Sequence, residues 1–232
     1  MKNNHTWVIC AYGESEFLEA CILSLQAQTL PSKIICYSST PLDSIKQLCQ
    51  KYGIPFYTKE GGGIGKDWNN ALSFVETSYA TIAHQDDYYE PTYLEAVMQK
   101  IEQSKDILIA YTDYFEEKNG VKIPANTNLK IKTLMLKTMN LMPASRFWRN
   151  RVLAFGNPIS CPAVTYNLET LRDFRFDEEM RVSLDWYAWY KISAYKGRFA
   201  YISEKLMCHR IHGESETTKT ISDNTRTKED LF

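Results

Sequence analysis

The first half of the chain alternates short runs of β-branched and aromatic residues with segments that carry apolar residues at helical spacing. The runs lie at residues 7–11, 34–37, 54–58, 79–83 and 107–111. Parallel strands need crossover connections, which helices usually supply, so this alternation is typical of a parallel sheet covered on both faces. We therefore predict an α/β fold with a mostly parallel central sheet flanked by helices, in which Ser15 caps the first helix.

The length of the chain bears on the number of domains, and its net charge bears on whether it binds nucleic acid. The chain has 232 residues, 44% of them hydrophobic, and a chain of this size can build one continuous core. We expect one domain rather than two small ones. The 27 basic and 28 acidic residues give a formal net charge of -1, which argues against nucleic acid as a partner.

The six cysteines indicate a reducing compartment. No two of them have the two-residue spacing of a zinc or redox motif, and Cys10, Cys21 and Cys36 fall on apolar runs or stripes, as buried thiols do. The N-terminus lacks the regions of a signal peptide, and no apolar run reaches the roughly 18 residues of a membrane span. We expect a cytoplasmic protein, with a peripheral position at the inner face of the membrane as an alternative.

A cluster of four glycines between residues 61 and 65 follows the third run. A Walker A loop is excluded because Glu60 and Asp67 occupy positions where it needs glycine and a hydroxyl residue. A dinucleotide fingerprint is excluded because its third glycine would fall on Lys66, and because it follows the first strand. The cluster is either a flexible turn or a loop whose missing side chains let a ligand approach the backbone.

The sequence His84-Gln85-Asp86-Asp87 directly follows the fourth run. Two adjacent carboxylates at the carboxyl end of a buried strand repel each other unless a cation or hydrogen-bond donors compensate, and open α/β sheets bind ligands at that edge. Mn²⁺ or Mg²⁺ commonly uses one or two carboxylates together with phosphate oxygens. The segment is either a metal site for a diphosphate or a turn in which one aspartate caps the helix after Pro91.

Residues 118–168 contain eight basic residues and no acidic one, with leucine, methionine and aromatic residues between them. Apolar residues at helical spacing usually belong to a core, so an ordinary packed subdomain is one interpretation. The alternative is a surface for an anionic acceptor or a membrane that carries a lipid-linked one. Phe147 and Trp148, beside two arginines, could also stack on a sugar ring.

Four segments resemble, in their order and spacing, the family 2 glycosyltransferases with a GT-A fold. They are residues 8–14, residues 61–72, the pair Asp86-Asp87, and Asp185 before an aromatic helix. The similarity covers nearly the whole chain, and it implies a nucleotide-sugar donor site at the carboxyl edge of the sheet. The donor-binding residues that it implies are Ala11, Tyr12, Glu14, Ser38, Gly63, Asn69, Asp86 and Arg210.

The chain also departs from the family pattern. Ser38 stands where the family has aspartates that contact the base, and Trp68 stands where it often has arginine. His84 takes the place of the first aspartate of the Asp-x-Asp motif. The resemblance therefore makes Asp86 the leading metal ligand and Asp87 the alternative, while His84 binds ribose, ligates the metal or packs.

The resemblance also places the catalytic groups of the second half. Asp185 aligns with the base of inverting members, which removes a proton from the acceptor hydroxyl as it attacks the anomeric carbon; an N-cap of the following helix is the alternative role. Arg210 and His212 align with the Arg-x-His segment that closes over the diphosphate, where Arg210 binds phosphate. His212 is a metal ligand or a donor to an oxyanion, and a solvated loop histidine is the alternative.

The activity implied by the resemblance is inverting transfer of a sugar, in polysaccharide biosynthesis, from a nucleoside-diphosphate donor to a hydroxyl. We expect a UDP-sugar donor, a glycan or lipid-linked acceptor, and Mn²⁺ or Mg²⁺ as cofactor. The single GT-A domain over 1–232 would have a nucleotide-sugar-binding half at 1–115, an acceptor-binding half at 116–213 and a polar tail at 214–232. The alternatives are a degenerate nucleotide- or glycan-binding protein without turnover and a nucleotidyltransferase.

Overall fold

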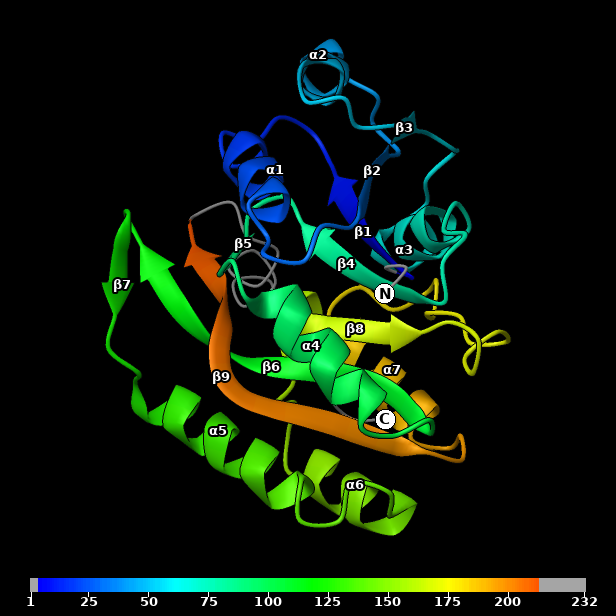
Figure 1. The fold of residues 1–232 in the computed structure, drawn as a ribbon, viewed down its shortest axis with the longest axis vertical. Coiled ribbons are helices and arrows are strands. Elements are labelled where there is room, and N and C mark those ends of the chain that lie inside the picture. The colour runs from blue at the N-terminus through cyan, green and yellow to red at the C-terminus, as the bar shows by residue number, and fades with distance from the viewer. Residues whose placement is uncertain (1–3, 213–232) are drawn as a thin grey trace.

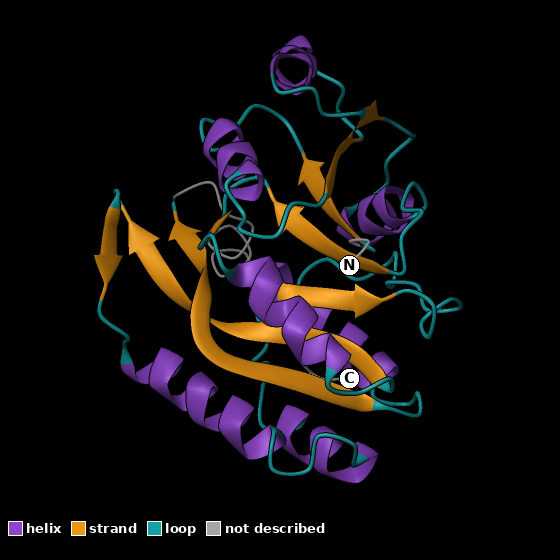
Figure 2. Cartoon of the chain, viewed as in Figure 1, coloured by secondary structure: helices purple, strands orange, loops and turns teal. Residues whose placement is uncertain are grey.

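The computed structural model describes residues 4–212, and its strands form one nine-stranded sheet (Figures 1 and 2). The order along the sheet is β3-β2-β1-β4-β8-β6-β9-β5, with β7 paired to β6. The strands are β1 (His5–Ala11), β2 (Lys33–Ser38), β3 (Phe56–Tyr57), β4 (Tyr79–His84), β5 (Tyr88–Tyr89), β6 (Ile107–Lys118), β7 (Val121–Ile123), β8 (Val164–Asn167) and β9 (Arg198–Ile211).

The direction of the strands confirms the prediction of a mostly parallel sheet. β1 pairs in parallel with β2 and β4, β2 with β3, and β6 with β9. β8 is antiparallel to both of its neighbours, β4 and β6, so these two strands run the same way. Six of the nine strands, namely β1 to β4, β6 and β9, therefore share one direction.

Helices cover both faces of the sheet (Figure 1). Trp7 and Ile9 of β1 belong to the core under α1, α2 and α4, whereas Val8 packs with Ala71 of α3 on the other face. Both faces of β1 are buried for this reason, which explains its nearly continuous apolar sequence. The helices are α1 (Leu18–Gln26), α2 (Asp43–Lys51), α3 (Ile64–Leu72), α4 (Tyr93–Glu102), α5 (Thr127–Met139), α6 (Arg146–Leu153) and α7 (Leu184–Ile192), with the short 3₁₀ turn η1 (Cys161–Ala163) before β8.

The basic stretch forms α5 and α6, which lie along one edge of the molecule (Figures 1 and 2). Arg149 of α6 is fully buried, and its guanidinium donates to the carbonyl oxygens of Pro143, Ser193 and Gly197 at 2.7–3.0 Å. This arginine therefore fastens α6 to the segments before α6 and after α7, because buried guanidinium groups need such acceptors. One of the eight basic residues thus has a structural role.

Several smaller predictions can be compared with the structure. The N-cap of α1 is Phe17, so the prediction that Ser15 caps this helix was wrong. All six cysteines are free, as their spacing indicates. Within residues 4–212 no helix is long and apolar enough to cross a membrane. β6 runs across residue 115, where the predicted halves meet, and the division into halves stays a prediction. The whole of the predicted polar tail at 214–232 lies outside the described residues.

Asn69 of α3 fastens the segment 174–180 to the first half of the chain. Its side-chain amide donates to the carbonyl oxygen of Phe176 at 3.0 Å and to Oε1 of Glu178 at 2.9 Å, and its Oδ1 accepts from the Phe176 amide at 2.9 Å. Backbone packing is tight at the same place, since a Cβ atom on Gly65 would lie 1.9 Å from the carbonyl oxygen of Asp177. Glycine at residue 65 is therefore required for this approach.

His5, the first residue of β1, is fully buried between polar side chains. Its Nδ1 lies 2.9 Å from Oγ of Ser32, and its Nε2 lies 2.9 Å from Oγ1 of Thr81. Burial lowers the pKa of His5 from 6.5 to about 3. The imidazole is therefore neutral in the folded protein, whereas the unfolded chain binds a proton below its ordinary pKa.

We expect Asn69→Ala to loosen the segment 174–180, because the substitution leaves the Phe176 amide and carbonyl without their partners. The free energy of unfolding should fall by about 1–3 kcal/mol. In the native state, trypsin should cleave after Arg175 or Arg181 several-fold faster than in the wild type. Asn70→Ala is the matched control on the same helix, since Asn70 binds Tyr37 and Glu60 instead. Equal cleavage rates in both variants would contradict this account.

The folded protein should lose stability as the pH falls from about 6.5 towards 3, because only the unfolded state takes up the His5 proton in this window. One such proton contributes up to about 1.4 kcal/mol per pH unit. His5→Gln should be less stable at pH 7, yet its stability should fall less steeply between pH 6.5 and 5. Denaturant unfolding at several pH values measures both slopes, and parallel slopes would show that His5 is not the group responsible.

Candidate active site

The candidate site lies where the carboxyl ends of β1 and β4 meet the end of β9. Cys10 of β1 pairs with His84 of β4, so the turns that follow these strands start side by side. β9 passes antiparallel to the short strand β5, which places Cys208 opposite Tyr88. The topology therefore brings three segments that are far apart in the sequence to one edge, where open α/β sheets bind ligands.

Asp86 lies at the centre of this edge. Its Oδ1 accepts from the Ser15 hydroxyl at 3.1 Å, and its Oδ2 lies 3.2 Å from Nε2 of His212. The guanidinium of Arg210 donates to the backbone carbonyl oxygen of Asp86 at 3.1 Å. The structure thus brings Asp86 together with Arg210 and His212 of the Arg-x-His segment, which the sequence indicated as a separate motif. Ser15, which was predicted to cap α1, instead orients the Asp86 carboxylate through this hydrogen bond.

Asp87 is only 2% exposed and is engaged within the protein. Its Oδ1 accepts from Nδ1 of His209 at 3.2 Å and from the backbone amide of Arg210 at 3.1 Å. Burial alone would raise the pKa of Asp87, but His209, His84 and the Arg210 amide outweigh it, and the pKa is lowered. Neither aspartate caps the following helix, whose N-cap is Thr92. Asp87 thus anchors β9, and its role as a metal ligand stays a prediction.

Arg210 is held from several sides. Its guanidinium lies 4.7 Å from the ring centre of Tyr88 and 5.1 Å from that of Phe17, and its Nε donates to Oε1 of Glu117 at 3.4 Å. The Tyr88 hydroxyl donates to the other oxygen of Glu117 at 2.8 Å. Sequence reasoning missed Glu117, Tyr88 and Phe17, because they belong to three elements and share no motif. These contacts fix the arginine beside Asp86.

His84 stacks on Trp68, the residue that stands in place of the family's arginine. The ring centres are 5.4 Å apart and the planes 27° from parallel. Burial lowers the pKa of His84, even though the two neighbouring aspartates oppose this. Of the three roles left open by the sequence, packing is therefore present in the structure, while binding of ribose or metal stays a prediction. Two of the three departures from the family pattern, Trp68 and His84, are therefore in contact with each other.

The turn after β1 is held by a side chain that sequence reasoning missed. The amide of Gln85 accepts from the Tyr12 backbone N–H at 3.1 Å and donates to the Tyr12 carbonyl oxygen at 2.9 Å. The Tyr12 side chain is left 66% exposed, whereas Ala11 is buried. The Tyr12 ring is thus accessible to a ligand while its backbone is fixed. In the sequence, only the position of Gln85 between His84 and Asp86 indicated that it could hold this turn.

The hydroxyl of Ser38 is used by the turn after β2. It accepts from the Thr40 backbone N–H at 3.1 Å and donates to the Thr40 carbonyl oxygen at 3.0 Å, and Ser38 is fully buried. The Thr40 hydroxyl in turn accepts from the Gly13 amide at 2.8 Å, which ties the two turns together. The predicted contact of Ser38 with a base stays a prediction.

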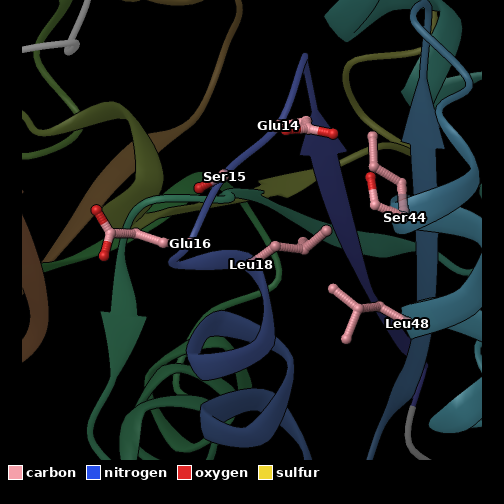
Figure 3. Close-up of a pocket in the computed structure, with 7 residues that line it drawn as sticks. Glu14, Ser15, Glu16, Leu18, Ser44 and Leu48 are labelled. Carbon is pink, nitrogen blue, oxygen red and sulfur yellow. The ribbon is translucent and has the colours of Figure 1, made fainter.

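A pocket opens beside this turn, between the loop that leads into α1 and the helix α2 (Figure 3). Figure 3 shows Glu14 and Ser44 at its upper part, with Leu18 and Leu48 pointing towards each other below them. Glu14 is exposed and carries a carboxylate that can accept hydrogen bonds from the hydroxyls of a ribose. Gly63, another predicted donor contact, begins α3 with a φ of +115°, a conformation that favours glycine.

Asp185 lies in the first turn of α7, whose N-cap is Ser183. Its Oδ2 accepts from the side-chain amide of Asn157 at 2.8 Å. Burial and, after it, the Asp185 carboxylate raise the pKa of the Cys161 thiol, and Asp87 adds to this effect. Both aspartates are therefore within electrostatic range of the same thiol in η1, which packs against β4. Asn157 is a further residue that the sequence did not indicate.

The donor set at Asp86 matches the way in which Mg²⁺ and Mn²⁺ bind nucleotides. Within residues 4–212 no group of three or more histidine, cysteine, aspartate and glutamate side chains is arranged as a metal cage. Asp86 and His212 face each other at 3.2 Å and offer one carboxylate and one imidazole. A hard divalent ion held by one or two side chains takes its other ligands from phosphate oxygens and water, so these residues fit such an ion once a diphosphate is bound.

Comparison with solved structures confirms the GT-A fold. The chain is similar to S. aureus TarS 1-349 in complex with UDP-GlcNAc, with a TM-score of 0.71 and 17% identity over 92% of this chain and 60% of that one. It is similar to the mannosyltransferase PcManGT from Pyrobaculum calidifontis in complex with GDP-Man and Mn²⁺, with a TM-score of 0.70 and 13% identity over 95% of this chain and 60% of that one.

Comparison of sequences points to the same group of enzymes. The glycosyltransferase GlyA of Streptococcus pneumoniae serotype 4 (strain ATCC BAA-334 / TIGR4) is 24% identical over 123 residues, which make up 50% of this chain but only 18% of that protein. Residues 6–163, more than half of the chain, match the model of the family described as "Glycosyl transferase family 2". The chain therefore belongs to glycosyltransferase family 2.

Proposed function

We propose that this protein transfers a sugar, with inversion, from a nucleoside-diphosphate donor to a hydroxyl of a glycan or lipid-linked acceptor in polysaccharide biosynthesis. The observation that carries the proposal is the meeting of Asp86, Arg210 and His212 at the edge of the sheet. The leaving group of such a transfer is a diphosphate, whose negative charge grows in the transition state. Cationic and metal-binding groups held in place beforehand stabilise that charge without reorganisation.

The donor would lie across the carboxyl ends of β1 and β4. The exposed Tyr12 ring and the Glu14 carboxylate are suited to the base and the ribose, and the guanidinium of Arg210 to the phosphates. Bound Mn²⁺ or Mg²⁺ would neutralise charge on the leaving diphosphate. Asp86 and His212 would hold it, while Ser15 keeps the Asp86 carboxylate oriented. TarS and PcManGT have UDP-GlcNAc and GDP-Man bound, and we propose a UDP-sugar here.

Asp185 would act as the general base. Inversion requires that the acceptor attacks from the side opposite the diphosphate, so the base and the metal must lie on opposite sides of the sugar. Asp185 comes from the second half of the chain, and its carboxylate acts electrostatically on the Cys161 thiol of η1, which packs against β4 of the first half. Its Oδ2 accepts from the Asn157 side-chain amide and its Oδ1 from the Trp186 backbone N–H, each at 2.8 Å, so the carboxylate has a defined orientation towards the acceptor hydroxyl.

Asp185→Asn should lower the rate of sugar transfer by about 10²- to 10⁴-fold, since the amide cannot accept the proton. The affinity for donor should change by less than about twofold, because the carboxylate acts on the acceptor. Calorimetry with UDP-GlcNAc and GDP-Man measures affinity, and NMR of the product's anomeric proton reports both rate and stereochemistry. The exposed Asp173→Asn is the control. Full activity of Asp185→Asn, or a retained anomeric configuration, would refute the assignment.

Asp86→Asn should abolish the dependence of nucleotide binding on metal. We expect the wild type to bind UDP or GDP at least about tenfold more tightly with Mn²⁺ than with EDTA, because an ion held by Asp86 would offset the negative charge of the phosphates. In the variant the two affinities should be nearly equal. Asp43→Asn, an exposed change on α2, should behave like the wild type. A variant that keeps the full Mn²⁺ effect would exclude Asp86 as a ligand.

A further inference from the structure

The exposed apolar side chains of this protein are concentrated in one segment. Eleven large hydrophobic residues are exposed within residues 4–212, and seven of them lie between Val121 and Phe155. Among these, Leu134 is 64% exposed, Leu141 73%, Phe147 71% and Phe155 86%. Single exposed apolar residues are ordinary, but such a concentration marks an interaction site.

Except for Val121 of β7, these side chains lie on α5, on α6 or within three residues after one of these helices. Lys130, Leu134 and Lys137 share one face of α5, and Leu141 follows in the turn after the helix, while the buried residues of α5, such as Leu136, point to the core. On α6 and just beyond it, Phe147, Arg151 and Phe155 follow at intervals of four. We call the surface formed by these exposed side chains the α5–α6 surface; its residues are Lys130, Leu134, Lys137, Leu141, Arg146, Phe147, Arg151 and Phe155.

The charge on the α5–α6 surface has a single sign. Lys130, Lys137, Arg146 and Arg151 are exposed there, and residues 118–168 contain no acidic residue. The Arg151 guanidinium lies 5.7 Å from the ring centre of Phe147, so basic and apolar groups are interleaved rather than segregated. Lysine is depleted in the cores of protein interfaces, whereas long basic side chains beside apolar ones suit the boundary of a lipid bilayer.

The α5–α6 surface ends beside the candidate base. The carbonyl oxygen of Leu153, at the end of α6, accepts from the indole of Trp186 at 2.9 Å, and Asn157 binds Asp185. Phe155 lies between these two anchors in the sequence. Figures 1 and 2 show α5 and α6 on an edge of the molecule with no other element outside them. A flat partner on this edge would therefore reach the acceptor side of the site.

We propose that the α5–α6 surface lies on an anionic membrane and that the acceptor is lipid-linked and enters at Phe155. This inference rests on the proposed function for the identity of the acceptor. The apolar side chains would enter the boundary between headgroups and acyl chains, and the lysines and arginines would face the phosphates. An acceptor with its lipid in the bilayer would then present its hydroxyl to Asp185 without leaving the membrane.

Flotation of the full chain with lipid vesicles tests the proposal. The wild type should bind vesicles of phosphatidylcholine with 30% phosphatidylglycerol at least tenfold more tightly than pure phosphatidylcholine, and the difference should shrink as salt rises from about 0.05 to 0.5 M. Equal or absent binding to the two kinds of vesicle would overturn the proposal whatever the variants do.

Two sets of substitutions locate the contact. The charge variant Lys130→Glu, Lys137→Glu, Arg146→Glu and the apolar variant Leu134→Ser, Phe147→Ser, Phe155→Ser should each reduce binding to anionic vesicles at least tenfold. The control variant carries matched changes elsewhere, at exposed positions: Leu23→Ser, Lys105→Glu and Lys196→Glu. It should bind like the wild type. If the control loses as much binding as the other two, the α5–α6 surface is not the contact.

Two further measurements distinguish a membrane-binding surface from failure of the proposed function and from a surface that binds a protein. Hydrolysis of the nucleotide sugar without acceptor should be unchanged in both variants, because no changed residue contacts the donor site. Vesicle binding without any donor turnover would contradict the proposed function but support membrane binding by the α5–α6 surface. Donor turnover without vesicle binding would contradict membrane binding alone. Self-association of the wild type that the variants lose, in the absence of vesicle binding, would assign the surface to a protein partner instead.

Discussion

The buried carboxylate of Asp87 is the interaction on which the candidate site depends. It joins the turn after β4 to the end of β9 through His209 and the backbone amide of Arg210, across more than 120 residues of sequence. A carboxylate that is only 2% exposed is tolerated only with such donors. By holding the backbone at residue 210, it sets where the guanidinium of Arg210 and the imidazole of His212 meet Asp86. Of the two adjacent aspartates, Asp87 thus holds the end of β9 in place, and Asp86 lies at the centre of the candidate site.

Side-chain amides also hold loops in place around the edge of the sheet. Gln85 pairs with both backbone groups of Tyr12, and Asn69 pairs with both backbone groups of Phe176. An amide can donate and accept in one plane, as a neighbouring strand does, so it can fix a loop without regular secondary structure. The loops of the donor side and of the acceptor side are thus both fastened to rigid elements. The α5–α6 surface is linked to the acceptor side as well. Asn157, two residues after Phe155, donates a hydrogen bond to the Asp185 carboxylate.

Much of the fold could be predicted from the sequence. The runs at 7–11, 34–37, 79–83 and 107–111 all became strands, because residues buried on both faces must be apolar and β-branched or aromatic residues fit there. The antiparallel strand β8 between β4 and β6 could not be predicted. Its four residues carry no periodicity that distinguishes it from a loop, and only the gap between two parallel strands gives it partners. The role of Ser15 could not be predicted either, since its hydroxyl accepts from the nearby Phe17 amide but donates to Asp86, which is 71 residues away.

For the site, the sequence by itself determined which chemical groups are present: the paired carboxylates after a strand, the Arg210–His212 segment and the acid at residue 185. These lie in short patterns whose meaning depends on neighbours in the chain. Tertiary structure alone decided that Asp87 is buried, that Glu117 and Tyr88 hold Arg210, and that Arg149 is a core residue rather than part of a charged surface. Burial and partnership are set by segments that approach one another only when the sheet and its helices close, and no local pattern records that approach.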